Sequence, residues 1–193
     1  MSHHPVSDER QESIVLVALE LLALGGPQAV TMKAVAEKTG LSRPAIYQYF
    51  SSSSHILAEL VINEMADLTN ALEDLLREVK DPLEKVRVWA HYSLVHLSTT
   101  DHALIQEISR QYLPDDQRGV IRALHGLLMG TIIEPLEALD IDDAPSVCGL
   151  IYGLVAAAAQ RILEGSQFLT EAKLLEGFLE AGLTRHTSPK AAN

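Results

Sequence analysis

The sequence predicts an all-α protein built from nine helices. Apolar residues recur every three to four positions along most of the 193-residue chain. No segment alternates apolar and polar residues convincingly, and no short β-rich run is enclosed by turn dipeptides. Glycine, proline and N-capping residues divide this helical pattern into segments, so the expected helices have start and end signals.

Three helices are expected within the first fifty residues. The first covers about residues 7–26 and ends at a glycine pair. The second lies between Thr31, a capping residue, and Gly40, which tolerates a left-handed backbone. The third begins after Ser42, a preferred N-cap. A short turn containing a glycine joins the last two, which indicates a helix-turn-helix that places its second helix in the major groove of DNA.

Six further helices are expected, and the first of them is a long rod shared by two domains. Residues 1–57 are expected to form a helix-turn-helix DNA-binding domain, and residues 58–193 a second helical domain, to which the family resemblance described next assigns effector binding and dimerisation. Pro135 is expected to end or kink the fourth of the six helices, and the tail from Thr184 to be disordered. The expected ranges of the six are about residues 54–79, from 81 onward, 101–114, 116–139, 143–165 and 170–182.

The helix-turn-helix segment resembles the N-terminal domain of the tetracycline-repressor (TetR) family of transcriptional regulators. The resemblance covers roughly residues 10–57 and rests on Thr31, Ala36, Gly40, Leu41, Ser42, Ala45, Ile46, Tyr47, Tyr49, Phe50 and Leu57. It implies a ligand-responsive regulator, most often a repressor, that binds double-stranded DNA at a pseudo-palindromic operator as a homodimer. An unknown small-molecule effector would release it. The alternative is a helical effector- or partner-binding protein in which DNA binding is weakened or lost.

The side chains that contact DNA follow from helix geometry and from the resemblance. Arg43, Ala45 and Gln48 lie on the outer side of the third helix, where arginine can bond guanine and glutamine can bond adenine. The resemblance adds a lysine of the second helix and several hydroxyl groups as base or phosphate contacts. Two of these hydroxyl residues are also N-caps, and Tyr47 has an alternative place in the core. The expected set is Thr31, Lys33, Ser42, Arg43, Pro44, Ala45, Tyr47, Gln48, Tyr49 and Ser53.

Two features weaken the positive charge that DNA-binding domains usually carry. The family usually has a lysine three residues after the position of Phe50, and this chain has Ser53 there. The net charge is −11; residues 1–60 hold four Lys and Arg against six Asp and Glu, and the rest holds 11 against 20. We therefore expect weaker and less salt-dependent DNA binding, with hydroxyls and helix N-termini holding phosphates.

The last two helices predict a homodimer interface, with an ordinary intramolecular core as the alternative. Glycine and alanine residues there let two backbones approach closely, and larger apolar residues add contact area. The expected interface residues are Gly149, Gly153, Ala156, Ala157, Gln160, Leu175, Phe178 and Leu179.

The effector pocket is expected between the middle helices, where aromatic, histidine and methionine side chains gather. Each of these side chains also suits a core or a surface. The candidates are Trp89, Tyr92, His96, Tyr112, His125, Met129 and Tyr152. His91 and His96 do not share a helix face well, so no metal site is expected, and no cofactor is expected either.

Enzymatic and membrane roles are not expected. The chain has no nucleophile elbow, no glycine-rich phosphate loop and no His-Glu-x-x-His motif. Its single cysteine, Cys148, fits a reducing cytoplasm. The apolar run at 150–159 is too short to span a bilayer. We therefore expect a non-enzymatic cytoplasmic protein without a membrane partner.

Overall fold

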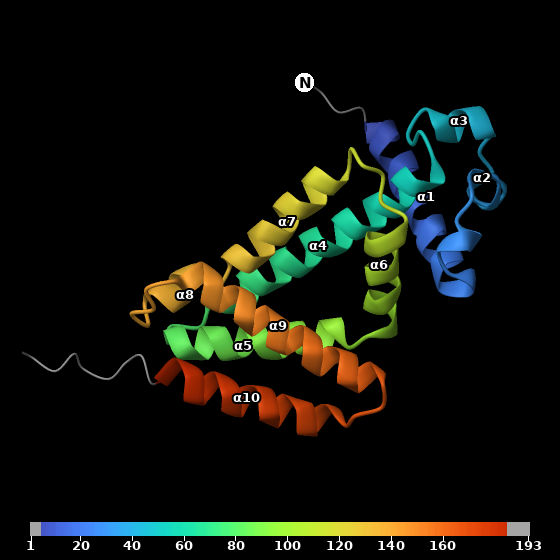
Figure 1. The fold of residues 1–193 in the computed structure, drawn as a ribbon. Helices are drawn as coiled ribbons and strands as arrows, with labels where there is room; N and C mark the ends of the chain where they lie inside the picture. The colour runs from blue at the N-terminus through green and yellow to red at the C-terminus, as the bar shows by residue number, and fades with distance from the viewer. Residues whose placement is uncertain (1–4, 185–193) are drawn as a thin grey trace, which may run out of the picture. The chain divides into compact units, whose positions relative to one another are not determined.

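The computed structural model describes residues 5–184, and within that range every regular element is a helix (Figure 1). The expected all-α fold is therefore confirmed. The elements are α1 (Pro5–Gly25), the 3-10 helix η1 (Pro27–Ala29), α2 (Met32–Thr39), α3 (Arg43–Tyr47), α4 (Ser53–Arg77), α5 (Pro82–Leu97), α6 (Thr100–Gln111), α7 (Arg118–Gly130), α8 (Ile133–Glu137), α9 (Ala144–Leu163) and α10 (Phe168–Thr184).

The chain packs into two compact units, each with its own hydrophobic core. The first unit comprises residues 1–66 and 103–124, and the second comprises residues 67–102 and 125–193. The chain passes from one unit to the other inside α4, α6 and α7. The expected functional division at residue 57 does not coincide with these packing boundaries, and it stays a prediction.

In the first unit, the predicted caps set the ends of the two motif helices. The Oγ1 of Thr31 accepts from the N–H of Ala34 at 3.1 Å, and the Oγ of Ser42 accepts from that of Ala45 at 3.3 Å. Each such cap stabilises a helix by roughly 1 kcal/mol. Gly40 ends α2 in a left-handed conformation with φ of 69°. The core beneath the motif includes Ile14, Val35, Ile46, Ile56 and Ile108.

In the second unit, α5 packs against α8, α9 and α10. The carboxylate of Asp81 caps α5 by accepting from a backbone N–H of the first turn at 2.8 Å. Trp89 of the same helix is fully buried, and its indole N–H donates to the hydroxyl of Thr131 at 2.8 Å. Arg161 of α9 donates two N–H groups to the Glu171 carboxylate of α10, at 2.6 and 2.8 Å, and thereby joins these two helices.

The structure divides the segment 116–139 into α7 and α8, so the single helix is wrong, although an interruption caused by Pro135 was expected. The interruption falls at Thr131, four positions before Pro135. A proline ring clashes with the carbonyl four residues before it, which interrupts the helix at that point. The Thr131 hydroxyl also donates to the carbonyl of Leu128 at 2.7 Å, in place of regular helix pairing. The described residues therefore form ten α-helices, besides the 3-10 helix η1, rather than nine helices.

Helix α9 (Ala144–Leu163) extends beyond the apolar run at 150–159 on both sides. Its 20 residues reach a mean hydropathy of 1.5, so by length and composition alone it is able to cross a membrane. One side of it, with Cys148, Ile151 and Val155, is buried in the core of the second unit. A core helix of a globular protein passes the same length and composition test. The tail expected to be disordered lies, beyond Thr184, outside the described residues.

Candidate DNA interface and effector region

Helix α3 is held by two buried side chains and presents others outward. Ile46 is fully buried, and Phe50, just after the helix, is 5% exposed. Arg43 and Gln48 are exposed, and Tyr47 is 51% exposed, so the alternative that places Tyr47 in the core is wrong. The other expected contacts of this segment are exposed or half-buried: Ser42, Pro44, Ala45 and Tyr49.

The start of α2 places Thr31 and Lys33 at the surface of the same unit. The Thr31 hydroxyl acts as the cap, and an oxygen in that role can still bond a phosphate through its proton. The Lys33 side chain is 71% exposed, and its ammonium lies 3.7 Å from Glu37 one turn later. Exposed pairs of this kind contribute little. Lys38, in contrast, is bonded to Glu20 at 2.8 Å.

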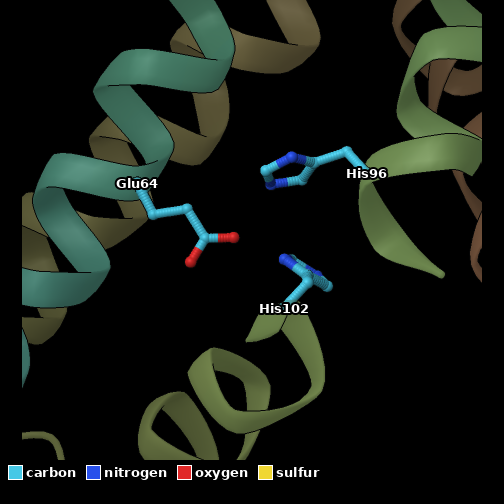
Figure 2. Close-up of side chains that lie close together, drawn as sticks. All are labelled: Glu64, His96 and His102. Carbon is cyan, nitrogen blue, oxygen red and sulfur yellow. The ribbon is translucent and has the colours of Figure 1, made fainter. Parts of the chain in front are cut away.

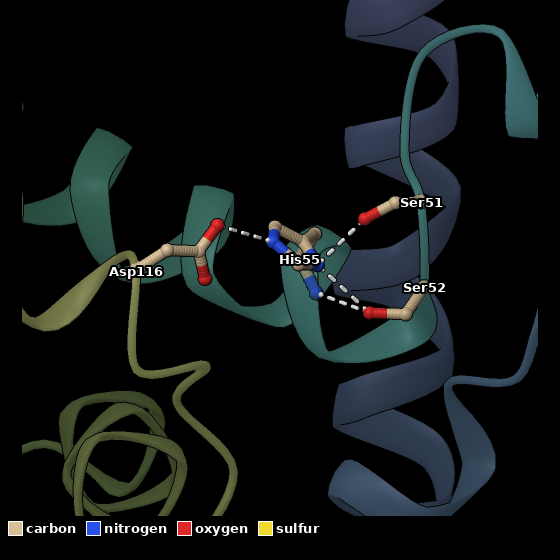
Figure 3. A network of polar contacts seen from close by, with 4 residues as sticks. All are labelled: Ser51, Ser52, His55 and Asp116. Carbon is tan, nitrogen blue, oxygen red and sulfur yellow. Dashed lines mark hydrogen bonds and ion pairs between the residues drawn. The ribbon is translucent and has the colours of Figure 1, made fainter.

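A polar network at the start of α4 was not predicted from the sequence. The Nε2 of His55 lies 3.0 Å from the Oδ2 of Asp116, which belongs to the connection between α6 and α7. The Nδ1 of His55 lies 2.9 Å from the hydroxyls of both Ser51 and Ser52 (Figure 3). The hydrogen bond from His55 holds the pKa of the Asp116 carboxyl below its ordinary value. Ser53, the expected phosphate contact, follows directly as the first residue of α4.

A second bond joins the end of α6 to the residues before the motif. The amide of Gln28 donates to the hydroxyl of Tyr112 at 2.6 Å. Tyr112 is an expected pocket residue, but the structure places it in the first unit, where this bond engages its hydroxyl. The segment that follows α6 is thus bonded at two places to the N-terminal segment that contains α2 and α3.

The other expected pocket residues lie in the second unit, in separate surroundings. Trp89 is fully buried in the core rather than lining an open cavity. His125 and Tyr152 meet edge to face, with ring centroids 5.1 Å apart, and burial raises the pKa of the Tyr152 hydroxyl. The carbonyl of Met129 accepts from the thiol of Cys148 at 3.2 Å. Burial raises the pKa of that thiol to about 11, so it is inert at neutral pH.

A cleft of about 500 Å³ lies between α5 and α10. The expected pocket residue Tyr92 lines it, and its floor is made of Ala90, Leu94, Leu175 and Leu179. The guanidinium of Arg87 at its edge lies 3.7 Å from Glu84 and 3.5 Å from Glu180, and its buried Nε has no hydrogen-bond partner. An apolar floor beside a charged edge is typical of sites for amphipathic small molecules.

His96 and His102 are the pair of possible metal ligands in the second unit (Figure 2). His96 lies in the last turn of α5 and His102 at the start of α6, with ring centroids 5.2 Å apart. Two imidazole nitrogens supply half of a tetrahedral set. Glu64, also drawn in Figure 2, belongs to the first unit. Pairing His91 with His96 in the sequence missed His102, because the neighbour of His96 lies on the next helix.

The expected dimer residues fall into two groups. Gly149, Gly153, Ala157 and Gln160 are exposed along one face of α9, Ala156 is half-buried beside them, and Phe178 of α10 is 64% exposed. Leu175 and Leu179 are instead 6% and 4% exposed. Their side of α10 faces the core of the second unit, so their apolar surface is already used within the chain.

Comparison with known sequences finds relatives among bacterial regulators. Residues 14–60 match the family described as bacterial regulatory proteins, tetR family. The chain is 26% identical over 102 residues to the HTH-type transcriptional activator FasR of Mycolicibacterium smegmatis, covering 52% of this chain and 47% of that protein. It is 30% identical over 80 residues to the HTH-type transcriptional repressor KstR of Rhodococcus jostii, covering 42% and 37%. The chain thus spans less than half the length of these curated relatives.

Comparison with solved structures extends the likeness beyond the helix-turn-helix. The fold is similar to that of the transcriptional regulator FadR from Bacillus subtilis, solved in complex with stearoyl-CoA. The TM-score is 0.72 at 16% identity, and the match covers 89% of this chain and 98% of that one. At this identity the likeness concerns the fold alone. One of the two sequence relatives is an activator and the other a repressor, so similarity does not decide the sign of regulation.

Proposed function

Since residues 14–60 match the tetR family of bacterial regulatory proteins, we propose that the chain is a ligand-responsive transcriptional regulator of this family, in the cytoplasm and without a membrane partner. It binds a pseudo-palindromic operator as a homodimer, represses transcription and is released by a small molecule. The observation that carries the DNA-binding part is the arrangement of α3. Ile46 and Phe50 hold this helix in the core while Arg43, Tyr47 and Gln48 stand outward.

The proposed contacts divide into base readers and phosphate binders. Arg43 and Gln48 have the donor patterns that match guanine and adenine edges in the major groove. Thr31 and Tyr47 offer hydroxyl groups, and Ser53 begins a 25-residue helix whose first N–H groups favour a phosphate. These phosphate contacts fix the position of the protein on the duplex and do not distinguish one base sequence from another.

The proposed dimer rests on apolar surface that the single chain leaves exposed. Leu150 and Leu154 of α9 are 70% and 39% exposed, and Leu174 and Phe178 of α10 are 50% and 64% exposed. Contiguous apolar surface of this kind marks interaction sites in soluble proteins. Two copies joined by a two-fold axis would present two α3 helices to the two halves of an operator.

The proposed effector site is the cleft between α5 and α10. Its apolar floor, with charged side chains of both signs at the lining (Arg87 and Lys173 beside Glu84 and Glu176), favours an amphipathic ligand. The FadR structure with stearoyl-CoA provides one such probe. Calorimetric titration with stearoyl-CoA should show binding that Val88→Trp, which fills the cleft, abolishes. Binding that Val88→Trp leaves unchanged would place the effector elsewhere.

The proposed function is tested by DNA binding in solution. Fluorescence anisotropy should show that the protein binds a labelled duplex from upstream of its own gene more tightly than a scrambled duplex of the same length. The difference expected for a specific site is at least about 10³-fold. Equal affinity for both duplexes would contradict sequence-specific regulation.

Two observations favour one other function, a helical effector- or partner-binding protein without DNA binding. Residues 1–60 have six Asp and Glu against four Lys and Arg, and Ser53 replaces the usual lysine. The same titration separates the two functions, because a protein that has lost DNA binding leaves both duplexes free even at low salt.

A further inference from the structure

His55 is bonded on both sides of its ring by groups that are far apart in the sequence. Asp116, on the Nε2 side, is 61 positions away from it, whereas Ser51 and Ser52, on the Nδ1 side, directly precede α4. An ionised carboxylate only accepts hydrogen bonds, so the Nε2 nitrogen carries a proton. The Nδ1 nitrogen of a neutral ring then accepts from a serine hydroxyl, and that of a charged ring donates to it.

We propose that His55 and Asp116 are positioning residues of the DNA interface. Together they fix the segment of Ser51 and Ser52, and with it the start of α4, in the place where Ser53 meets a phosphate. This inference rests on the proposed DNA binding. It adds two residues that the helix-turn-helix itself does not contain, one of them from the connection between α6 and α7.

The local geometry shows why this segment needs such a support. Residues 51 and 52 form a bend between the buried Phe50 and the first turn of α4. The Oγ of Ser52 also accepts from the backbone N–H of His55, at 3.3 Å, so the serine and the imidazole order the same turn. Phosphate bonding depends on the direction of hydroxyl and N–H groups, and this direction is set by that turn.

Because Asp116 is negatively charged, a positioning role and a purely electrostatic role predict opposite changes in DNA affinity when the carboxylate is removed. The Asp116 side chain is 66% exposed, and a carboxylate near a phosphate contact repels DNA. If charge alone mattered, any substitution that removes it would tighten DNA binding. If Asp116 acts by positioning, loss of the acceptor weakens binding although a negative charge has been removed.

The decisive comparison uses Asp116→Ala, Asp116→Asn and the neighbouring control Asp115→Ala. Asp115 is fully exposed and pairs with Arg118 at 3.1 Å, so its removal changes charge without touching His55. With the upstream and scrambled duplexes as probes, Asp116→Ala should weaken binding to both by about 3- to 10-fold, as the loss of one hydrogen bond implies. Asp116→Asn keeps an acceptor oxygen and should bind at least as tightly as the wild type, as should Asp115→Ala.

Two variants of His55 test the hydrogen bonds of its two ring nitrogens one at a time. Glutamine can place an amide N–H near the position of Nε2, so His55→Gln keeps the bond to Asp116 and loses the serines. Asparagine can place its oxygen near Nδ1, so His55→Asn keeps the serines and loses Asp116. Both should weaken binding, and adding Asp116→Ala should weaken His55→Gln further but should not weaken His55→Asn. Circular dichroism and thermal unfolding confirm that each variant is folded.

The possible failures are distinct. Tighter binding by Asp116→Ala, Asp116→Asn and Asp115→Ala alike would overturn the positioning role while leaving the proposed function intact. Additive effects of Asp116→Ala in both His55 variants would overturn it as well. A wild-type protein that binds neither duplex would overturn the proposed function, and the inference with it.

Discussion

Arg43 and Ile46 stand three positions apart on α3 and have opposite surroundings. Ile46 is fully buried in the core of the first unit, whereas Arg43 is exposed at the first position of the helix. Burial of an isoleucine stabilises the fold by roughly 1.5–3 kcal/mol, which is enough to hold a short helix that would not form alone. The position of Arg43, which we propose to read a base, therefore depends on the burial of Ile46.

At the residue scale, Arg43→Ala and Tyr47→Phe should weaken DNA binding in different ways. Loss of a bidentate base contact should cost about 1–3 kcal/mol and relax the preference at one base pair of each half-site. Loss of the Tyr47 hydroxyl should weaken binding to all sequences similarly, because phosphates carry no base identity. Anisotropy titrations on the upstream and scrambled duplexes distinguish the two. Equal losses on both duplexes for Arg43→Ala would show that Arg43 does not read a base.

The Arg161–Glu171 pair gives a pH dependence at the same scale. The hydrogen bonds from Arg161 hold the pKa of Glu171 below its ordinary value of 4.5. A carboxyl with a lowered pKa in the folded state contributes stability above its unfolded pKa, and this contribution is lost as the pH falls through the lowered value. In urea unfolding, the free energy of unfolding should therefore decrease less between pH 7 and pH 3 for Glu171→Gln than for the wild type or the exposed control Glu73→Gln. The same decrease in the free energy of unfolding for Glu171→Gln and the wild type would contradict a stabilising role of the Arg161–Glu171 pair.

At the element scale, the start of α4 tests the missing lysine. Ser53→Lys adds a cation at the proposed phosphate contact, and each neutralised phosphate steepens the slope of log affinity against log salt by about 0.9. Asn63→Lys, ten residues later and exposed on the same helix, adds the same charge about 15 Å away, beyond the screening length at 0.1 M salt. Only Ser53→Lys should steepen the slope. Equal slopes for wild type and Ser53→Lys would place the start of α4 away from the DNA backbone.

Helix α9 tests the dimer at the same scale. Apart from the backbone of its own helix, no heavy atom lies within 4 Å of a Cβ atom added at Gly153, which is exposed, so the single chain has room for Gly153→Arg. Two copies in close contact there cannot. Light scattering at micromolar concentration should show a wild-type dimer and a folded Gly153→Arg monomer with little affinity for a full operator. A wild-type monomer, or a dimer that persists in Gly153→Arg, would place the interface elsewhere.

Elements were predictable from the sequence where short-range chemistry decides them. The signals of Thr31, Gly40 and Ser42 act within one or two turns, so α2 begins and ends, and α3 begins, where the sequence predicts. An interruption by Pro135 was expected, but its position between α7 and α8 was not. A proline interrupts a helix four residues before itself, and the sequence alone did not show that Thr131 would bond Trp89 at that point.

At the scale of the whole molecule, the missing information was the packing of distant segments. The pairing of His55 with Asp116 and of Gln28 with Tyr112 joins residues 61 and 84 positions apart, and no local pattern marks either pair. The burial of Leu175 and the cleft beside it were not predicted for the same reason, because both depend on how α10 packs against a distant helix. The apolar spacing of α10 predicts a buried face, but not whether the neighbour is the same chain or a second copy.

The regulator proposed here is tested most directly by sedimentation velocity with a fluorescently labelled duplex from upstream of the protein's own gene. We expect a labelled species that contains two chains per operator, at protein concentrations where a scrambled duplex of the same length sediments free. A species with one chain per duplex would contradict the dimeric regulator, and so would equal association with both duplexes.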